Sequence, residues 1–266
     1  MIVLDNIEHR RSFVERFREV APQLGIDANA STDAQLFRLF ELFARGWTIE
    51  ETLEKLAAIS NQICSIVEVE GEYSAPRGTG FLVAPNLVLS AAHVIVDPDE
   101  RLGYYRCSFN NIRFRDNDVL SATPVSVLID AQVLLSTASP ISSLSTGALD
   151  VTLLRLQEAV GETRGFISVG DEVPAQGEPV YVISHPGGNA VSFSAGKVSR
   201  AHNQLTDVAV YHDVDTADGA SGAPIFNREF DLIGLHRGAA VDGNGDRDAA
   251  VVTAILNLIE QHLPPN

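Results

Sequence analysis

The sequence predicts a mainly β protein that begins with a small helical domain, and three observations support this. Over residues 1–60 apolar residues recur three or four positions apart, as on the buried face of a helix. From Gln62 onward short β-branched runs alternate with Gly, Pro, Asn and Asp, which is typical of antiparallel barrels or sandwiches. Helical spacing returns over Ala249–Leu263, where we expect a closing C-terminal helix. We therefore divide the chain into domains at 1–60 and 61–266.

Three helices are expected in the first domain. The apolar face of the first consists of Ile7, Phe13, Phe17, Val20 and Leu24. Thr32 with Gln35 is a capping box that opens the second helix, and Gly46 ends it. Thr48 with Glu51 caps the third. We predict that these helices form a bundle separate from the β domain.

The strands expected in the second domain are short and bounded by turn residues. They are the runs Ile63–Val69, Phe81–Val83, Leu87–Leu89, Val125–Ile129, Val151–Leu156, Val180–Ile183, Val208–Tyr211 and Leu232–Leu235.

Composition restricts the partners and the compartment. The formal net charge of −16 disfavours binding to nucleic acid or to an anionic membrane, and we expect neither as a partner. The first residues lack a signal-peptide pattern and no apolar stretch is long enough to cross a bilayer, so we expect a cytoplasmic protein. Cys64 and Cys107 fit buried free thiols in that setting, with a disulfide as the alternative.

A serine between glycines is the first candidate for chemistry. The stretch Asp215-Thr-Ala-Asp-Gly-Ala-Ser-Gly-Ala-Pro224 places Ser221 between Gly219 and Gly222. Glycines allow a tight turn whose N–H groups converge on one point. A serine hydroxyl becomes a good nucleophile only when a base takes its proton and donors stabilise the oxyanion. Ser221 is therefore a candidate nucleophile.

A histidine and an acid complete the pattern. His93 follows two short strands and the small residues Ser-Ala-Ala, which leave room for its ring. Asp150 enters the apolar run Val151–Leu156, where a buried carboxylate needs a partner such as an imidazole N–H. Asp130, also beside an apolar run, is the alternative acid.

These motifs, in the order His, Asp, Ser, resemble the chymotrypsin-clan serine peptidases, in particular the bacterial trypsin-like branch that includes glutamyl endopeptidases. The resemblance covers roughly residues 60–263 and implies two β-barrels joined near residues 157–174. It implies His93 as general base, Asp150 as its orienting acid and Ser221 as nucleophile, and it assigns the oxyanion hole to the N–H groups of Gly219 and Ser221. Neither a metal nor another cofactor is expected.

The chain departs from the animal digestive branch of this clan at two positions. Val94 stands where those enzymes have a disulfide-forming cysteine, and Ala220 replaces the aspartate that captures a newly cut N-terminus. Activation by that capture is therefore not expected. Two further segments resemble the second barrel: Ser184-His-Pro-Gly-Gly188 with Gly196-Lys-Val198, and Ile233–Gly238 as the strand beside the substrate.

The resemblance also suggests a substrate preference. His236 and Thr216 match the positions at which glutamyl endopeptidases recognise an acidic side chain, and both are expected to contact substrate. Asp215 matches the anionic floor of the trypsin pocket, where a carboxylate facing inward would favour Lys or Arg. We favour an acidic residue at the cleaved position, with small or apolar residues and basic residues as alternatives.

The rest of the substrate strand is less typical of the family. Arg237 replaces a small residue and Ala239 replaces a glycine that lines the pocket, and both are expected to contact substrate together with Gly238. The segment Asp242–Asp248 has the alternating oxygen ligands of a calcium loop, but we interpret it as a polar hairpin turn. The remaining histidines, His212 among them, are expected at the surface or in packing roles.

We therefore predict a serine endopeptidase that acts on a peptide or protein. The helices at 1–60 resemble an adaptor that recruits a sensor protein, as in bacterial immune or cell-death systems; the alternative is a structural cap. A rival interpretation is a peptidase fold that binds peptides without cutting them, or that its own helical domain inhibits.

Overall fold

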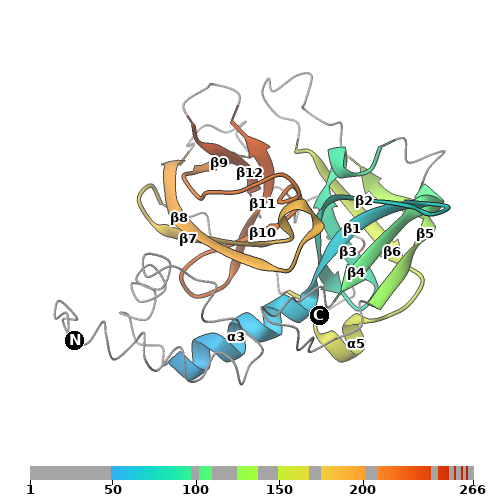
Figure 1. Cartoon of the computed structure of the whole chain (residues 1–266). Helices are drawn as coiled ribbons and strands as arrows, with labels where there is room; N and C mark the ends of the chain where they lie inside the picture. Colours follow the sequence, from blue (N-terminus) through green and yellow to red (C-terminus); the bar gives the residue numbers. More distant parts are fainter. Residues whose placement is uncertain are drawn as a thin grey trace.

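A computed structural model shows a mainly β protein in which two closed antiparallel barrels of six strands each lie side by side (Figure 1). The predicted mainly β fold with two antiparallel barrels is confirmed. The structure describes residues 49–96, 102–109, 125–136, 149–167, 175–201, 209–240 and 245–251, together with Ile255, Ile259 and His262.

The first barrel closes in the strand order β1-β2-β3-β6-β5-β4. Its strands are β1 (Ile63–Glu70), β2 (Tyr73–Ala84), β3 (Leu87–Ala91), β4 (Tyr105–Phe109), β5 (Val125–Ser136) and β6 (Val151–Leu156). Alternation explains β4, which the sequence analysis did not include: Tyr105, Cys107 and Phe109 are buried and the two residues between them are partly exposed. A short 3₁₀ turn, η3 (Leu102–Tyr104), precedes it.

The second barrel closes in the order β10-β11-β12-β9-β8-β7. Its strands are β7 (Pro179–Ser184), β8 (Ser192–Ala201), β9 (Ala209–His212), β10 (Pro224–Phe226), β11 (Leu232–Ala239) and β12 (Arg247–Val251). The strand–loop–strand pair expected at residues 184–198 is confirmed, because β7 pairs with β8 around the 3₁₀ turn η5 (Pro186–Gly188). The link from the first barrel carries the short helix α5 (Gly161–Arg164).

Two bulges change the register near the site. In the β1–β2 pair, Ile66 faces Gly78 and Val67 faces Pro76, so Arg77 is the extra residue of β2. In the β11–β12 pair, the register shifts between His236 and Gly238, so Arg237 is the extra residue of β11. A bulge bends a strand and turns a side chain or carbonyl away from the ladder.

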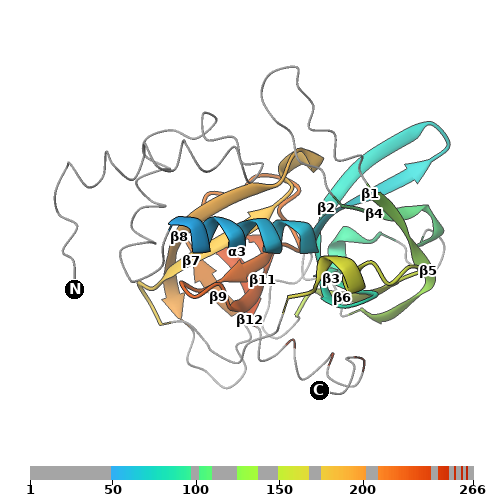
Figure 2. The same ribbon diagram turned by 90° about the horizontal axis from the view of Figure 1, so that it is seen from below.

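The third predicted helix is confirmed as α3 (Ile49–Gln62), which runs beneath the barrels (Figure 2). Its Leu56 and Ile59 are buried in the same hydrophobic cluster as the strands of the first barrel. The two helices predicted before it lie outside the described residues. α3 is thus packed against the first barrel.

The C-terminal segment differs in part from the prediction. Ala249, Ala250 and Val251 belong to strand β12, where Ala249 pairs with His236, and not to the expected helix. The neighbouring Ala249 and Ala250 are both buried in this strand, so their apolar character did not by itself distinguish a strand from a helix. Ile255 and Ile259 are helical and fully buried in the core.

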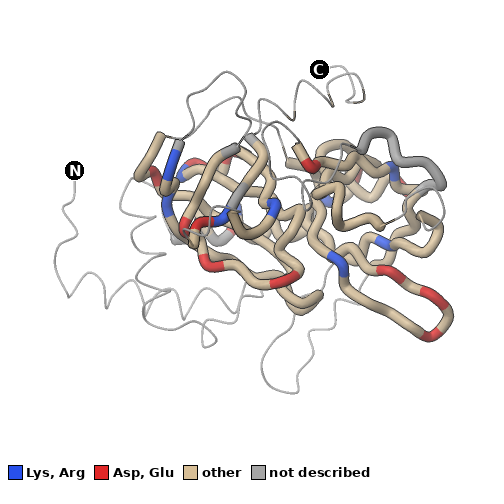
Figure 3. The backbone as a smooth tube through the Cα atoms, turned by 90° about the horizontal axis from the view of Figure 1, so that it is seen from above, with Lys and Arg blue, Asp and Glu red and all other residues tan. Residues whose placement is uncertain are grey.

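The cysteines follow the expectation of buried free thiols. Acidic and basic residues alternate over both barrels, with acidic residues gathered on the β1–β2 hairpin (Figure 3). Cys64 and Cys107 are buried free thiols, and burial, together with a hydrogen bond to Cys107, raises the pKa of the Cys64 thiol well above its ordinary value. Among the described residues, no helix combines the length and the apolar character needed to cross a membrane.

The end of the predicted polar hairpin turn is described from Gly245. There the Asp246 carboxylate accepts a hydrogen bond from Arg200 Nε at 2.9 Å. This bond joins the residue just before β12 to β8. Within the described ranges no group of three or more potential metal ligands occurs.

Candidate active site

The Asp150 carboxylate contacts His93 at the end of the β3–β6 ladder. β3 leads directly into the 3₁₀ turn η2 (Ala92–Val94), which carries His93, and Asp150 immediately precedes β6. The His93 ring nitrogen Nδ1 lies 2.6 Å from Asp150 Oδ2, and the His93 backbone N–H donates to Oδ1 at 3.0 Å. The Asp150 carbonyl accepts the Ala92 N–H at 3.0 Å. The acid therefore fixes both the ring and its backbone.

Burial gives this pair an inner and an outer side. The Asp150 side chain is 1% exposed and the His93 side chain is 16% exposed. Because Nδ1 faces the carboxylate, Nε2 on the other edge of the ring is available for exchange of a proton. Asp150 has a φ of 52°, a left-handed conformation that aspartate tolerates better than most residues. The side chain of Asp130, the alternative acid, lies outside the described residues.

Ser221 lies in the turn before β10, and glycines bring that turn against the first barrel. A Cβ on Gly78 would lie 2.8 Å from the Ser221 carbonyl oxygen and 2.6 Å from the Val94 side chain. A Cβ on Gly222 would lie 2.9 Å from the Ala91 nitrogen. Such approaches require glycine. The serine turn therefore packs directly on the segment that carries the histidine.

The Ser221 hydroxyl does not reach the histidine in this structure. Its Oγ donates to the Arg237 carbonyl oxygen at 3.3 Å, long for a hydroxyl hydrogen bond. Among the described residues no hydrogen bond joins Ser221 to His93. The bulge at Arg237 presents its carbonyl to Ser221, and the Arg237 side chain is half-buried.

The peptide groups of the serine turn are held by their carbonyls. The Asp218 carbonyl accepts the Gly187 N–H at 2.6 Å, and the Ala220 carbonyl accepts the Ala223 N–H at 2.9 Å. The C=O and N–H of a trans peptide point in opposite directions. The next N–H groups, those of Gly219 and Ser221, are thus turned away from these contacts, and neither has an acceptor among the described residues.

Of the predicted substrate-contacting residues, Thr216 lies against His236 on β11. The His236 Nε2 lies 3.3 Å from Thr216 Oγ1, and its Nδ1 lies 3.3 Å from Nε2 of His212 on β9. The Val214 N–H donates to His212 Nδ1 at 3.3 Å. Arg247 on β12 donates to the Thr216 carbonyl at 3.3 Å. The expectation that His212 has only a packing role is incomplete, since it is a direct partner of His236.

Both buried histidines lose basicity. Burial lowers the pKa of His212 to about 4. Burial, followed by the charges of His212 and Arg247, lowers the pKa of His236 well below its ordinary value, and the charge of His93 contributes as well. Both rings are therefore neutral at pH 7, and each carries a single N–H.

The remaining predicted residues lie farther from this buried pair. Asp215 is exposed, whereas the adjacent Thr216 is partly buried with its hydroxyl against His236. Gly238 and Ala239 follow the bulge on β11, half-buried and exposed respectively. No hydrogen bond among the described residues links Asp215 to His236.

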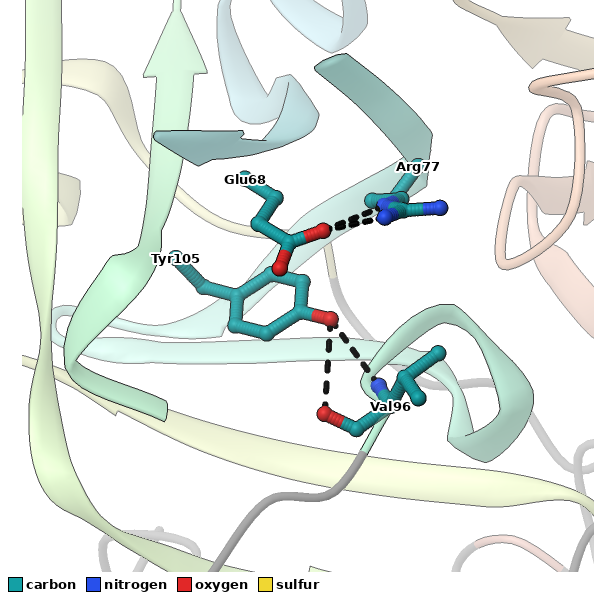
Figure 4. Close-up of polar contacts among 4 residues, drawn as sticks. All are labelled: Glu68, Arg77, Val96 and Tyr105. Carbon is teal, nitrogen blue, oxygen red and sulfur yellow. Dashed lines mark hydrogen bonds and ion pairs between the residues drawn. The ribbon is translucent and has the colours of Figure 1, made fainter. Parts of the chain in front are cut away.

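A second polar cluster supports the strands around the site (Figure 4). The buried Glu68 carboxylate accepts a hydrogen bond from Arg77 Nε at 2.7 Å and also pairs with Nη2 of that guanidinium. Its register partner Tyr105 accepts the Val96 N–H at 3.0 Å through the phenolic oxygen. The first contact holds the bulge of β2 just before Gly78, and the second holds the chain just after the His93 turn.

The barrels and the His93–Asp150 pair define the chymotrypsin type of fold, and comparison with known proteins agrees. Residues 78–235 match the trypsin-like peptidase domain family, and the chain belongs to that family. The matched residues include His93, Asp150 and Ser221.

Two curated relatives are similar over most of the chain. A probable serine protease of Lysobacter enzymogenes is 29% identical over 195 residues, covering 66% of this chain. The uncharacterized protein y4fB of Sinorhizobium fredii is 27% identical over 216 residues, covering 71%. The matched region is 29% of the length of each relative, so the chain corresponds to less than a third of either.

Solved structures share the fold at low sequence identity. The active form of the Rv3671c protease of M. tuberculosis has a TM-score of 0.53 and 18% identity, over 77% of this chain and 82% of that one. A Glu endopeptidase has a TM-score of 0.55 and 20% identity, over 76% of this chain and 90% of that one.

Proposed function

We propose that this protein is a serine endopeptidase in which Ser221 is the nucleophile, His93 the general base and Asp150 its orienting acid. The observation that carries the proposal is the double contact of Asp150 with His93, beside the turn that bears Ser221. A carboxylate on Nδ1 keeps the proton on that nitrogen and leaves Nε2 to accept the serine proton. Asp150 then stabilises the imidazolium that forms.

The remaining steps use groups already near the serine. Ser221 attacks the peptide carbonyl, and the N–H groups of Gly219 and Ser221 receive the oxyanion. His93 returns the proton to the leaving amine, which gives an acyl-enzyme. Water activated by His93 then hydrolyses the ester.

The serine hydroxyl rotates before it reacts. It donates to the Arg237 carbonyl at 3.3 Å, and rotation about the Cα–Cβ bond redirects the proton to His93. A substrate backbone N–H that takes the Arg237 carbonyl would release the hydroxyl for this rotation. Such contacts are often long before substrate binds and shorten in the complex.

Active-site labelling tests the nucleophile. The full chain should react with a fluorophosphonate and cleave an unfolded protein substrate, and Ser221→Ala should abolish both while the protein stays folded. Ser74→Ala, at an exposed serine of the β1–β2 hairpin, is the matched control and should label like the wild type. Labelling that persists in S221A would refute the assignment.

We also propose that the enzyme prefers an acidic residue at the cleaved position, because a directed chain of donors ends at Thr216. The Val214 N–H can only donate, so His212 Nδ1 is the acceptor and Nε2 carries the proton. That N–H donates to His236 Nδ1, which leaves the proton of His236 on Nε2, facing Thr216 Oγ1. The Thr216 hydroxyl therefore offers its own proton, and a carboxylate is the strongest acceptor for it.

Charge around Thr216 points the same way. The Arg247 guanidinium donates to the Thr216 carbonyl, and its positive charge favours an anion at this position. Asp215 is exposed, and no hydrogen bond among the described residues joins it to His236, so it is not part of the buried donor chain that ends at Thr216. These features support the acidic preference over the small, apolar or basic alternatives.

A matched peptide series tests the preference. Peptides that differ only in Glu, Gln, Ala or Lys at the cleaved position are compared by kcat/KM, and Glu should exceed Gln by at least about tenfold because Gln lacks the charge. Equal rates for Glu and Gln, or a faster Lys peptide, would refute the acidic preference and leave the nucleophile untouched.

Finally, we propose that residues 1–60 act as an adaptor that brings this cytoplasmic peptidase to a sensor protein in a bacterial immune or cell-death system. Because Leu56 and Ile59 of α3 pack in the barrel core, a truncation that tests this should keep α3 and begin near Trp47. Equal activity of the full chain and of residues 47–266 supports recruitment. Higher activity of the shorter chain supports the rival interpretation, inhibition by the helical segment.

A further inference from the structure

Thr79 on β2 is the point at which the first barrel holds the serine turn. It is fully buried, and its polar groups form four hydrogen bonds to three different segments. Its N–H donates to the Ser221 carbonyl at 2.8 Å, and its Oγ1 donates to the Gly219 carbonyl at 2.7 Å. The same Oγ1 accepts the His185 N–H at 3.0 Å, and the Thr79 carbonyl accepts the Ser90 hydroxyl at 2.7 Å.

These contacts complete the set of restraints on the serine turn. The carbonyls of residues 217, 218, 219, 220 and 221 each accept a hydrogen bond, and Thr79 supplies two of the five donors. A peptide whose carbonyl is fixed has a fixed N–H as well. The orientation of the Gly219 and Ser221 N–H groups therefore depends on the donors that hold their neighbours.

The Thr79 hydroxyl joins the serine turn to the loop after β7, and that loop orients the peptide between Asp218 and Gly219. That loop contains His185 and Gly187, and the Gly187 N–H holds the Asp218 carbonyl. A Cβ on Gly219 would lie 2.8 Å from the His185 carbonyl oxygen, so loop and turn are in direct contact. By accepting from His185 and donating to Gly219, one oxygen atom fixes the spacing between them.

We propose that the Thr79 hydroxyl is a positioning group for the oxyanion hole: through the Gly219 carbonyl and the His185 N–H it holds the two donor N–H groups in place. The inference rests on the proposed peptidase mechanism. A threonine hydroxyl both donates and accepts, and valine, of the same shape, does neither. Replacement by valine keeps the shape of the side chain and removes the link, and it leaves the His185 N–H and the Gly219 carbonyl without this hydroxyl as a partner.

The test compares Thr79→Val and Thr79→Ser in the full chain. We expect T79V to lower kcat about 10- to 100-fold, less than the loss of an oxyanion donor itself, with KM within about twofold. T79S keeps the hydroxyl and should stay within about threefold of the wild type. The inhibition constant of a peptide boronic acid, whose adduct places an oxygen in the oxyanion hole, should rise in T79V in parallel with the loss of kcat/KM.

Several outcomes would overturn the inference. Wild-type kcat and boronic acid affinity in T79V would do so, as would a T79S variant as impaired as T79V. If T79V does not fold, as judged by its thermal transition, Thr79→Ala and Thr79→Cys replace it, and wild-type kcat in both would have the same meaning. A wild-type chain that no fluorophosphonate labels refutes the peptidase mechanism instead, so the two failures are distinguishable.

Discussion

Asp150 holds His93 through both carboxylate oxygens, one at 2.6 Å from the ring nitrogen Nδ1 and one at 3.0 Å from the backbone N–H. The two bonds have different consequences. The backbone bond sets where the 3₁₀ turn leaves β3, and the ring bond sets which nitrogen carries the proton. An acid that is 1% exposed makes both contacts without competition from water.

Asp150→Asn should therefore preserve the fold and lose most of the activity. The amide can still accept the backbone N–H, but its NH₂ group facing Nδ1 stabilises the wrong imidazole tautomer, so we expect kcat to fall by about 10³–10⁴. Steady-state kinetics with the best peptide of the series measures the loss. Asp130→Asn, at the acid that sequence alone left as an alternative, is the control and should retain activity. The reverse result would transfer the role to Asp130.

Thr216→Val should weaken the acidic preference without disabling catalysis. Valine removes the hydroxyl at which the donor chain from Val214 ends, so the substrate carboxylate loses a donor. The ratio of kcat/KM for Glu and Gln peptides should fall by about tenfold, since one hydrogen bond to a charged group is lost, while kcat for the Gln peptide stays within a few-fold. An unchanged ratio would mean that Thr216 does not contact the substrate carboxylate.

The sequence predicted the features that depend on local pattern. Runs such as Val151–Leu156 became strands within a residue or two, because β-branched residues bounded by turns rarely fit another structure. The pairing of His93 with Asp150 was also foreseen, since a carboxylate that enters an apolar strand needs a partner. The helix predicted to follow Thr48 was confirmed as α3, which begins at Ile49.

Features that depend on closing the barrels were not predictable in the same way. His212 stands in no motif, and it meets His236 only because β12 lies between β9 and β11 in the barrel. Thr79 lies between two glycines in the sequence, and its contact with Gly219 spans 140 positions. The available signal for His212 was its position directly after the strand run Val208–Tyr211, where alternation places it on the same buried face as Val210.

Replacing Arg77 should destabilise the first barrel through the buried Glu68. The Glu68 side chain is 2% exposed and that of Arg77 is 39% exposed, so Arg77→Met leaves a buried carboxylate without its guanidinium. We expect the free energy of unfolding to fall by about 2 kcal/mol, below the usual cost of breaking a buried pair because water reaches the Arg77 side. Urea denaturation measures it.

A double-mutant cycle separates that charge from simple loss of packing. The variant that combines Glu68→Gln with Arg77→Met has no buried charge, so it should recover at least half of the loss in R77M. Additive losses in the two single variants would show that the pair contributes no coupling.

The free energy of unfolding should decrease as the pH is lowered from about 6.5 to about 4, because the pKa of His212 is lowered over this range in the folded chain. Burial lowers the pKa of His212 to about 4 from an ordinary value of 6.5, so above pH 6.5 the ring is neutral in both the folded and the unfolded chain. Between 6.5 and 4 the unfolded chain binds a proton that the folded chain does not, and the free energy of unfolding falls by about 1.4 kcal/mol per pH unit for this one group, roughly 3 kcal/mol in all. His236, whose pKa is also lowered, adds to the slope in the same direction.

The contribution of His212 is isolated by comparing the wild type with His212→Gln at pH 7, 6 and 5 in urea. The variant loses hydrogen bonds and is less stable at pH 7, but it has no ring to protonate on unfolding. The stability gap between the two proteins should therefore narrow as the pH falls, by about 1.4 kcal/mol per unit once the pH is well below 6.5. Carboxylates that titrate near pH 4 affect both proteins equally and cancel from the difference. A gap that stays constant from pH 7 to 5 would mean that the folded chain binds a proton at His212 as readily as the unfolded chain does, which would contradict a lowered pKa for the buried ring.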